Sequence, residues 1–206
     1  MGILSNSVSL ARYRVDGSFG DDESVMEAVE KGLRQHSIYD IDNESQEKAV
    51  GWTSFNRPFL PDFGGSSFAI GTFFVFALRI DKKSVSSRTV NKHFEAVMAQ
   101  KLSETGRDFL SRNEKKILKE QVTDVLLKRI PATPNLYDVI WHFENRALWF
   151  FSTQKAANEE LETLFYKSFN HHITRLFPYT MADQTAGLDE NQLDRLAKAV
   201  PSPFTS

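Results

Sequence analysis

Residues 68–80 read FAIGTFFVFALRI and carry the strongest strand pattern in this sequence. Alternate positions place apolar residues on both faces of a strand: Phe74, Phe76, Leu78 and Ile80 on one, and Phe73, Val75 and Ala77 on the other. Because both sets are apolar, we expect the strand to be buried on most of both faces. The stretch therefore predicts a sheet with a substantial core.

On the N-terminal side, the pattern predicts a strand, a helix and a second strand. Residues 7–15 alternate as a strand, and Asp22 or Ser24 can cap the helix that follows, with Gly32 weakening its end. A short strand is expected around Trp52, over residues 49–55. The loop at residues 57–67 (RPFLPDFGGSS) holds two Pro and two Gly, so it separates this strand from the next.

On the C-terminal side, the spacing of the apolar residues changes from every second residue, as in a strand, to the spacing of a helix. Residues 89–104 form an amphipathic pattern, and Ser111 with Glu114 three positions later predicts a capping box for a second helix. Pro131 and Pro134 end that helix. Its expected apolar stripe is Leu118, Val122, Val125 and Leu126.

The alternation of apolar residues that is typical of strands returns in the final third of the chain. Residues 136–143 and 146–151 predict a hairpin, Thr153 can cap the next helix, residues 173–179 suit a closing strand, and residues 189–199 suit a short helix. The order is β-α-β-β-α-α-β-β-α-β-α. This order predicts an α+β fold with mostly antiparallel sheets and packed helices, in three parts: 1–81, 82–133 (a basic helical pair) and 134–206.

The composition excludes several classes of protein. With no cysteine, the chain has no disulfide, no thiolate chemistry and no cysteine-ligated zinc, and we expect a reducing, cytoplasmic location. The start of the chain lacks the pattern of a signal peptide or a myristoylation site. The most apolar run, residues 68–78, is shorter than the roughly 18 residues of a membrane span, so we expect no membrane partner.

Catalytic motifs are absent from the sequence. The five histidines lack metal-ligand spacing, the glycines lack phosphate-loop spacing, and no nucleophile motif occurs. Asp21, Asp22 and Glu23 suit the start of a helix better than a cation site. We therefore expect no enzyme, no cofactor and no metal, although a nuclease built from dispersed carboxylates remains an alternative. The histidines are His36, His93, His142, His171 and His172.

Charge is unevenly distributed along a chain whose net charge is −2. Residues 82–129 hold 12 Lys and Arg against 6 Asp and Glu, a net of +6 between acidic flanks. Arg112, Lys115, Lys116 and Lys119 follow the i, i+3, i+4, i+7 spacing of one helical ridge, which suits contact with phosphates. A solvated helix face is the competing interpretation. Further cations that could extend the field are Lys82, Lys83, Arg88, Lys92, Lys128 and Arg129.

Spaced matches then point to a family. They comprise EKKILKEQVTDVLLKR at residues 114–129, the hairpin YDVIWHFENRALWFFST, the helix start QKAANEELETL, and the pairs Tyr13-Arg14 and Gly51-Trp52. On these residues the chain resembles the RdgC family of bacterial recombination-associated DNA-binding proteins. It departs from the family at residues 127–131 (LKRIP), where members tend to carry L-P-R-A-F, and it is shorter than familiar members at the C-terminus.

The resemblance implies a dimeric, ring-like, non-enzymatic protein of the nucleoid. It would bind double-stranded DNA without sequence preference and restrain a RecA-type recombinase. Combined with the charge pattern, it makes Arg112, Lys115, Lys116 and Lys119 the expected phosphate contacts, aided by Arg88, Lys92 and Arg129. The rival interpretation is a protein-interaction module that regulates a full-length family partner.

Overall fold

The structure is a computed structural model that describes residues 2–17 and 24–200. It is an α+β fold with one antiparallel sheet and packed helices, which confirms the expected class. The strands are β1 (Ala11–Val15), β2 (Lys48–Ser54), β3 (Ala69–Ile70), β4 (Phe73–Lys82), β5 (Thr133–His142), β6 (Ala147–Phe150) and β7 (Ile173–Leu176). The helices are α1 (Val25–Gln35), α2 (Ser87–Thr105), α3 (Arg112–Leu127), α4 (Lys155–Phe169), α5 (Pro178–Thr185) and α6 (Glu190–Lys198), with a 3-10 turn at Gly64–Ser66.

The sheet has the order β2-β4-β5-β6-β1-β7, with β3 paired to β4. Strands β4 and β5 pair over ten residues each, from Phe73 with His142 to Lys82 with Thr133. The N-terminal strand β1 lies between β6 and β7, so segments from both ends of the sequence form one sheet.

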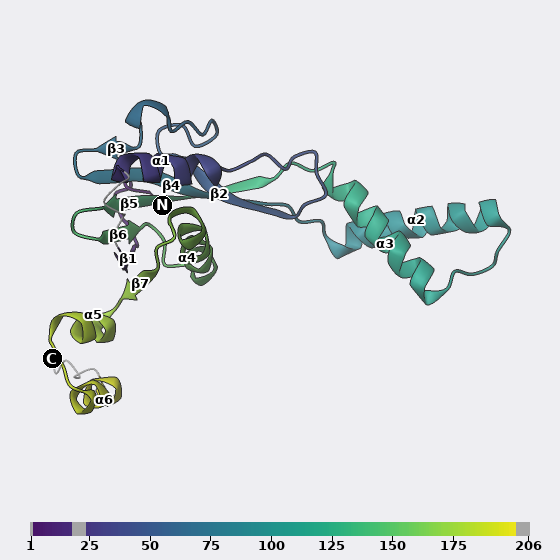
Figure 1. The fold of residues 1–206 in the computed structure, drawn as a ribbon. Helices are drawn as coiled ribbons and strands as arrows, with labels where there is room; N and C mark the ends of the chain where they lie inside the picture. Colours follow the sequence, from purple (N-terminus) through teal and green to yellow (C-terminus); the bar gives the residue numbers. More distant parts are fainter. Residues whose placement is uncertain (1, 18–23, 201–206) are drawn as a thin grey trace.

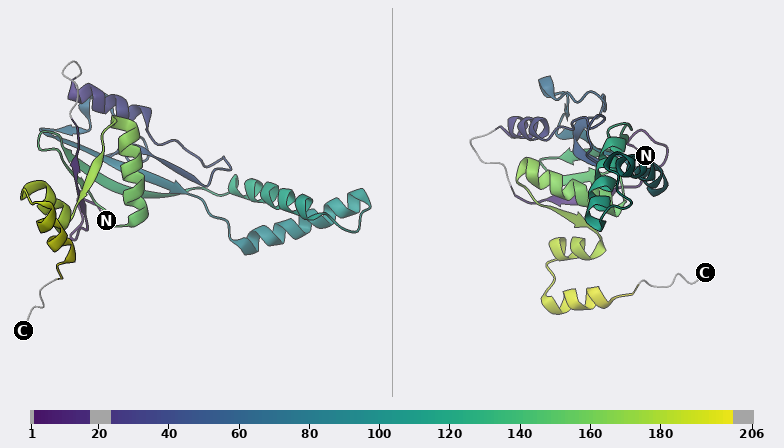
Figure 2. Two further views of the ribbon diagram at one scale, coloured as in Figure 1. Left: turned by 60° about the horizontal axis from the view of Figure 1, so that its bottom comes forward. Right: turned by 90° about the vertical axis from the view of Figure 1, so that its right-hand side faces the viewer.

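The main core lies between one face of the sheet and helices α1 and α4, which lie on the same side of it (Figure 2). Trp141 and Phe74 from the sheet and Phe165 and Phe169 from α4 are buried and in ring contact. Burying a side chain of this size contributes about 1.5–3 kcal/mol before entropy costs. This aromatic layer holds the helices on the sheet.

Gly32 allows α1 and α4 to approach closely. A Cβ atom at this position would lie 2.5 Å from the carbonyl oxygen of Ser168 and 2.7 Å from the ring of Phe169. The sequence suggested that Gly32 weakens the end of its helix, but the residue is buried inside α1, where the missing side chain makes room for α4.

The opposite face of the sheet is less buried than the sequence predicted. Phe73 and Val75 on β4 are only half-buried, so the expectation of a strand buried on most of both faces is wrong for them. Ala77 on the same face is buried. Near it the loop after β2 covers the sheet, because Thr53 Oγ1 and Arg79 Nη1 both donate to the carbonyl oxygen of Pro58.

Helices α2 and α3 form an arm that projects from one end of the sheet (Figures 1 and 2). We use "arm" for residues 83–132 and "body" for the sheet with α1 and α4. A small apolar cluster of Val85, Val90, Val122 and Leu126 joins the start of α2 to the end of α3. The two helices are therefore antiparallel and are held together next to the body.

Several expected boundaries differ from the structure. Residues 68–80 are two strands, because Gly71 adopts a φ of 60° and turns the chain between β3 and β4. The closing strand ends at Leu176, and Pro178, which suits a first helical position, begins the unexpected helix α5. The N-cap of α4 is Gln154 rather than Thr153.

Other details bear on the helix predictions. Ser24 is the N-cap of α1 but makes no side-chain capping hydrogen bond, and Asp22 lies outside the described residues. The capping box of α3 is confirmed. Within its predicted apolar stripe, Val125 is 49% exposed, so that assignment was wrong, whereas the other three residues are buried.

Candidate nucleic-acid interface

The candidate interface begins with the capped N-terminus of α3. Ser111 Oγ accepts a hydrogen bond from the amide of Glu114, and the Glu114 carboxylate accepts one from the amide of Ser111. Arg107, in the loop before the helix, donates to both oxygens of the same carboxylate at 2.7 and 3.1 Å. These bonds fix the first turn, from which the cationic ridge starts.

The cationic ridge consists of Arg112, Lys115, Lys116 and Lys119 on α3. All four side chains are exposed, and the ridge runs about 10 Å along the helix at 1.5 Å per residue. Lys116 Nζ lies 3.9 Å from Glu120 Oε1, and both side chains are so exposed that this pair stabilises the helix by only about 0.3–0.5 kcal/mol. Within residues 2–17 and 24–200, the other three cations have no carboxylate within 4.0 Å.

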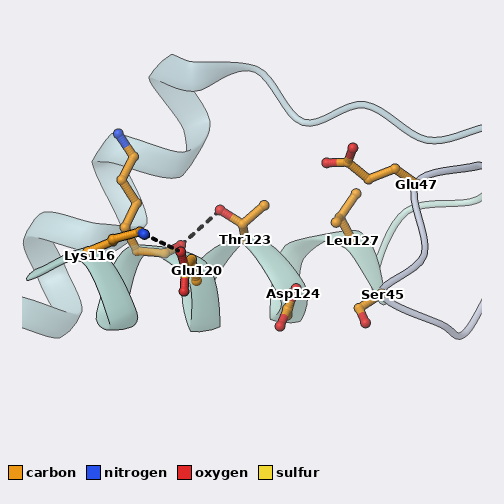
Figure 3. A pocket seen from close by; sticks show the side chains of 8 residues that line it. Ser45, Glu47, Lys116, Glu120, Thr123, Asp124 and Leu127 are labelled. Carbon is orange, nitrogen blue, oxygen red and sulfur yellow. Dashed lines mark hydrogen bonds and ion pairs between the residues drawn. The ribbon is translucent and has the colours of Figure 1, made fainter. Parts of the chain in front are cut away.

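Carboxylates gather near the C-terminal half of the ridge. An open concavity of about 380 Å³ is lined by Lys116 and Lys119 together with Glu120 and Asp124 from α3 and Glu47 from the loop before β2 (Figure 3). The positive potential should therefore be strongest at the N-terminal half, around Arg112 and Lys115.

The remaining predicted site residues lie elsewhere on the arm. Arg88 and Lys92 are exposed on α2, each about 160° around the helix from Val90, which packs against α3. They therefore face away from α3 and do not join the ridge. Arg129 follows the end of α3 and lines a groove between the two helices.

A scan against protein-family models matches residues 9–186 to a model described as "Putative exonuclease, RdgC". The chain belongs to the RdgC family. Family membership makes it a recombination-associated DNA-binding protein in general terms. A search of curated proteins finds no match to this chain.

One cation assigned to the positive field is not at the surface of this RdgC-family protein. Lys83 is only 4% exposed, and its ammonium group donates to three backbone carbonyls, so it cannot contribute to a surface that binds phosphate. Its neighbour Lys82 is exposed on β4. The sequence could not distinguish the two, because both follow the strand pattern predicted over residues 68–80.

The apolar surface of the arm was missed by the sequence analysis. Phe109, in the loop that joins α2 to α3, is 72% exposed. A groove of about 230 Å³ between the helices is lined by Val97, Val125 and Leu126. A Phe in a loop between two amphipathic helices was the available signal.

The structure offers less support for the other sites that the sequence raised. The group Asp21, Asp22 and Glu23 lies outside the described residues. In the part of the chain that the structure describes, no group of three or more His, Asp or Glu residues is arranged so that it could hold a metal ion. None of the described helices is long and apolar enough to cross a membrane. His171 and His172 directly precede β7.

Proposed function

We propose that the protein binds double-stranded DNA without sequence preference through the cationic ridge of α3. The observation that carries this proposal is the exposure of four cations on one helical face of a projecting arm. A ridge of about 10 Å is commensurate with a few phosphates at about 3.4 Å per base step. Because a row of Lys and Arg contacts phosphates and not base edges, we expect no sequence preference.

The overall acidity of the chain is compatible with this function. Phosphate binding requires a local positive surface, and the arm supplies it while the flanking segments carry the negative charge. The ridge makes the primary contacts in this proposal. Arg88, Lys92 and Arg129 provide separate positive patches on other sides of the arm, which would meet a second stretch of duplex or a duplex held between two arms.

We further propose that the protein is a non-enzymatic homodimer of the nucleoid that restrains a RecA-type recombinase. The support for pairing is that four apolar side chains of the arm are exposed, namely Phe109, Ile117, Val97 and Val125. Occupation of the DNA would restrain a recombinase, and membership of the RdgC family supports this part of the proposal.

Binding to DNA is tested by a gel-shift or fluorescence titration across a salt series. The wild type should bind unrelated duplexes equally, with affinity that falls steeply as salt rises. Replacing Lys115, Lys116 and Lys119 by Gln should reduce the slope of log K against log salt by about 0.9 for each phosphate that the variant no longer neutralises.

A matched variant removes the same charge from the body and its C-terminal extension. Lys155→Gln, Lys167→Gln and Lys198→Gln change three exposed lysines of α4 and α6, and binding should stay close to wild type. Absence of wild-type binding, or equal loss in both triple variants, would rule out the ridge as the interface.

The description of the family model favours exonuclease activity as a second candidate. Incubation of end-labelled DNA with the protein and Mg²⁺ or Mn²⁺ tests it directly. Release of labelled nucleotides would show exonuclease activity and contradict the proposal that the protein is non-enzymatic.

A third candidate is an interaction module that regulates a full-length partner of the family. It is favoured by the exposed apolar side chains of the arm. Light scattering and pull-down with a full-length family member, both without DNA, distinguish it from the first proposal. Pairing with that partner in a protein that fails the DNA titration would support this candidate.

A further inference from the structure

Two short connections join the arm to the body. They leave the sheet side by side, because Lys82 at the end of β4 pairs with Thr133 at the start of β5. Within the arm, the buried cluster of Val90, Val122 and Leu126 joins α2 to α3 but contains no residue of the body. The direction of the arm relative to the sheet must therefore be set by contacts at the two connections.

Lys83 makes such contacts in the first connection. Its buried ammonium donates to the carbonyl oxygens of Asp42 at 2.7 Å, Glu44 at 3.0 Å and Leu127 at 3.0 Å. An ammonium group has three N–H donors, so all three are used. Leu127 is the last residue of α3, and a cation at the C-terminal end of a helix also interacts favourably with the helix dipole.

The loop that accepts two of these bonds also holds the second connection. We call residues 38–47 the junction loop; Figure 1 shows it extending from the body towards the base of the arm. Asp42 Oδ1 accepts a hydrogen bond from the amide of Ala132 at 2.7 Å. The amide of Lys83 donates to the carbonyl of Glu47 at 2.8 Å.

Apolar contacts reinforce the same arrangement. Ile38 and Ile41 of the junction loop are buried with Ala49 of β2, and Ala132 packs against them. The junction loop therefore contacts both connections, and Lys83 is the side chain that links it to the end of α3.

We infer that Lys83 is a positioning residue that fixes the direction of the arm relative to the sheet. Loss of its ammonium leaves three carbonyls at the junction without their donor, and burying such groups unpaired is unfavourable. The end of α3 is then released from the junction loop while the sheet and the two arm helices keep their own contacts. Only the consequence for DNA binding rests on the proposed function.

The absence of native cysteine makes a distance measurement straightforward. Nitroxide labels on Asn113→Cys in α3 and Thr163→Cys in α4 report the distance from the far end of the arm to the body by pulsed electron spin resonance. Lys83→Met, which keeps the length of the side chain and removes its donors, should broaden this distance distribution.

Two further variants make the measurement specific. Lys82→Met removes the same charge from an exposed neighbouring residue and should leave the distribution narrow. Asp42→Ala, which removes the acceptor for Ala132, should broaden it through the second connection. A label pair within the body, Thr163→Cys with Glu144→Cys, should remain narrow in every variant.

The distance measurement alone decides whether Lys83 positions the arm, because it does not involve DNA. An unchanged arm-to-body distribution in Lys83→Met overturns it, and so does broadening of the body pair, because Lys83 would then stabilise the fold as a whole. Broadening confined to the arm-to-body pair supports it.

The consequence for DNA binding is read in a separate titration. If the released arm spends about one-tenth to one-third of its time in the binding direction, duplex affinity falls about three- to tenfold. The salt slope should not change, because the ridge itself is intact. A wild-type protein without affinity for DNA would refute the proposed function, while the distance measurement would still decide the role of Lys83.

Discussion

The body and the arm of this protein differ in how much apolar side-chain surface each of them buries. The body buries a continuous layer of large aromatic residues between the sheet and two helices, including Trp52, Trp141 and Phe165. The arm has a buried cluster of only Val90, Val122 and Leu126, and most of its other side chains are exposed.

This difference shows how one chain can separate stability from binding. The aromatic core of the body can hold the fold without help from surface charge, so the arm can expose cations and apolar side chains that contribute little to folding. The cost is that the arm depends on the junction for its direction. Substitutions in the two regions should therefore have different effects.

The largest contrast is expected from the same substitution in each region. Phe165→Ala removes a fully buried ring that lies 5.0 Å from Trp141 and 4.7 Å from Phe169, so we expect a loss of about 3–5 kcal/mol in the free energy of unfolding. Phe109→Ala removes an exposed ring and should change it by less than about 0.5 kcal/mol.

Urea unfolding followed by far-ultraviolet circular dichroism measures both values. Similar losses in the two variants would show that the arm is as important to stability as the body, and the two regions would not differ in the way proposed.

Glycines provide a second, smaller contrast. Gly32→Ala places a Cβ atom 2.5 Å from a backbone oxygen of α4, which the packed core can accommodate only by moving, at about 1–3 kcal/mol. Gly106→Ala in the arm meets no atom within 4 Å, but the residue has a φ of 64°, so the cost is backbone strain of about 1–2 kcal/mol.

Hydrogen exchange distinguishes the two glycine effects. Gly32→Ala should reduce protection of amides in α1 and α4, whereas Gly106→Ala should reduce it only at the far end of the arm. Loss of protection in α4 from the Gly106 variant would contradict the separation of the two regions.

The smallest effect concerns pH at the start of α3. The pKa of Glu114 is lowered from 4.5 to about 2, first because Arg107 donates hydrogen bonds to its carboxylate, and then because the amide and hydroxyl of Ser111 also interact with it. Since the pKa in the folded state is depressed, the stabilising contribution is complete above pH 4.5. It is lost as pH falls through about 2.

The amide shift of Ser111 should follow this titration in NMR spectra. Its midpoint should lie near pH 2 in the wild type, rise in Arg107→Gln, and disappear in Glu114→Gln. A wild-type midpoint at the ordinary pKa of a glutamate would show that the Arg107 pair does not persist in solution.

Much of the fold followed from local patterns in the sequence. The α3 capping box, the β5–β6 hairpin and the alternation of β4 are short-range signals, and the structure has all three. The turn at Gly71 and the helix that begins at Pro178 were missed, because apolar residues on both sides resemble continuous strands.

The candidate site was less accessible from sequence. The helical spacing of the ridge was sufficient to place its four cations on one face of α3. It could not show that Glu47 would line the same concavity as Lys119, or that Arg88 and Lys92 would face away from α3, because both depend on packing between distant segments. Lys83 is the clearest case, since its three acceptors come from residues 42, 44 and 127.

The continuous pairing of β4 with β5 has a consequence for protein engineering. Since Lys82 and Thr133 are cross-strand neighbours, the chain could pass directly from one strand to the other through a tight two-residue turn. The arm, residues 83–132, could thus be removed or exchanged as one unit. An armless version would retain the register of the sheet, and foreign helical hairpins of other lengths or charges could be grafted at the same point.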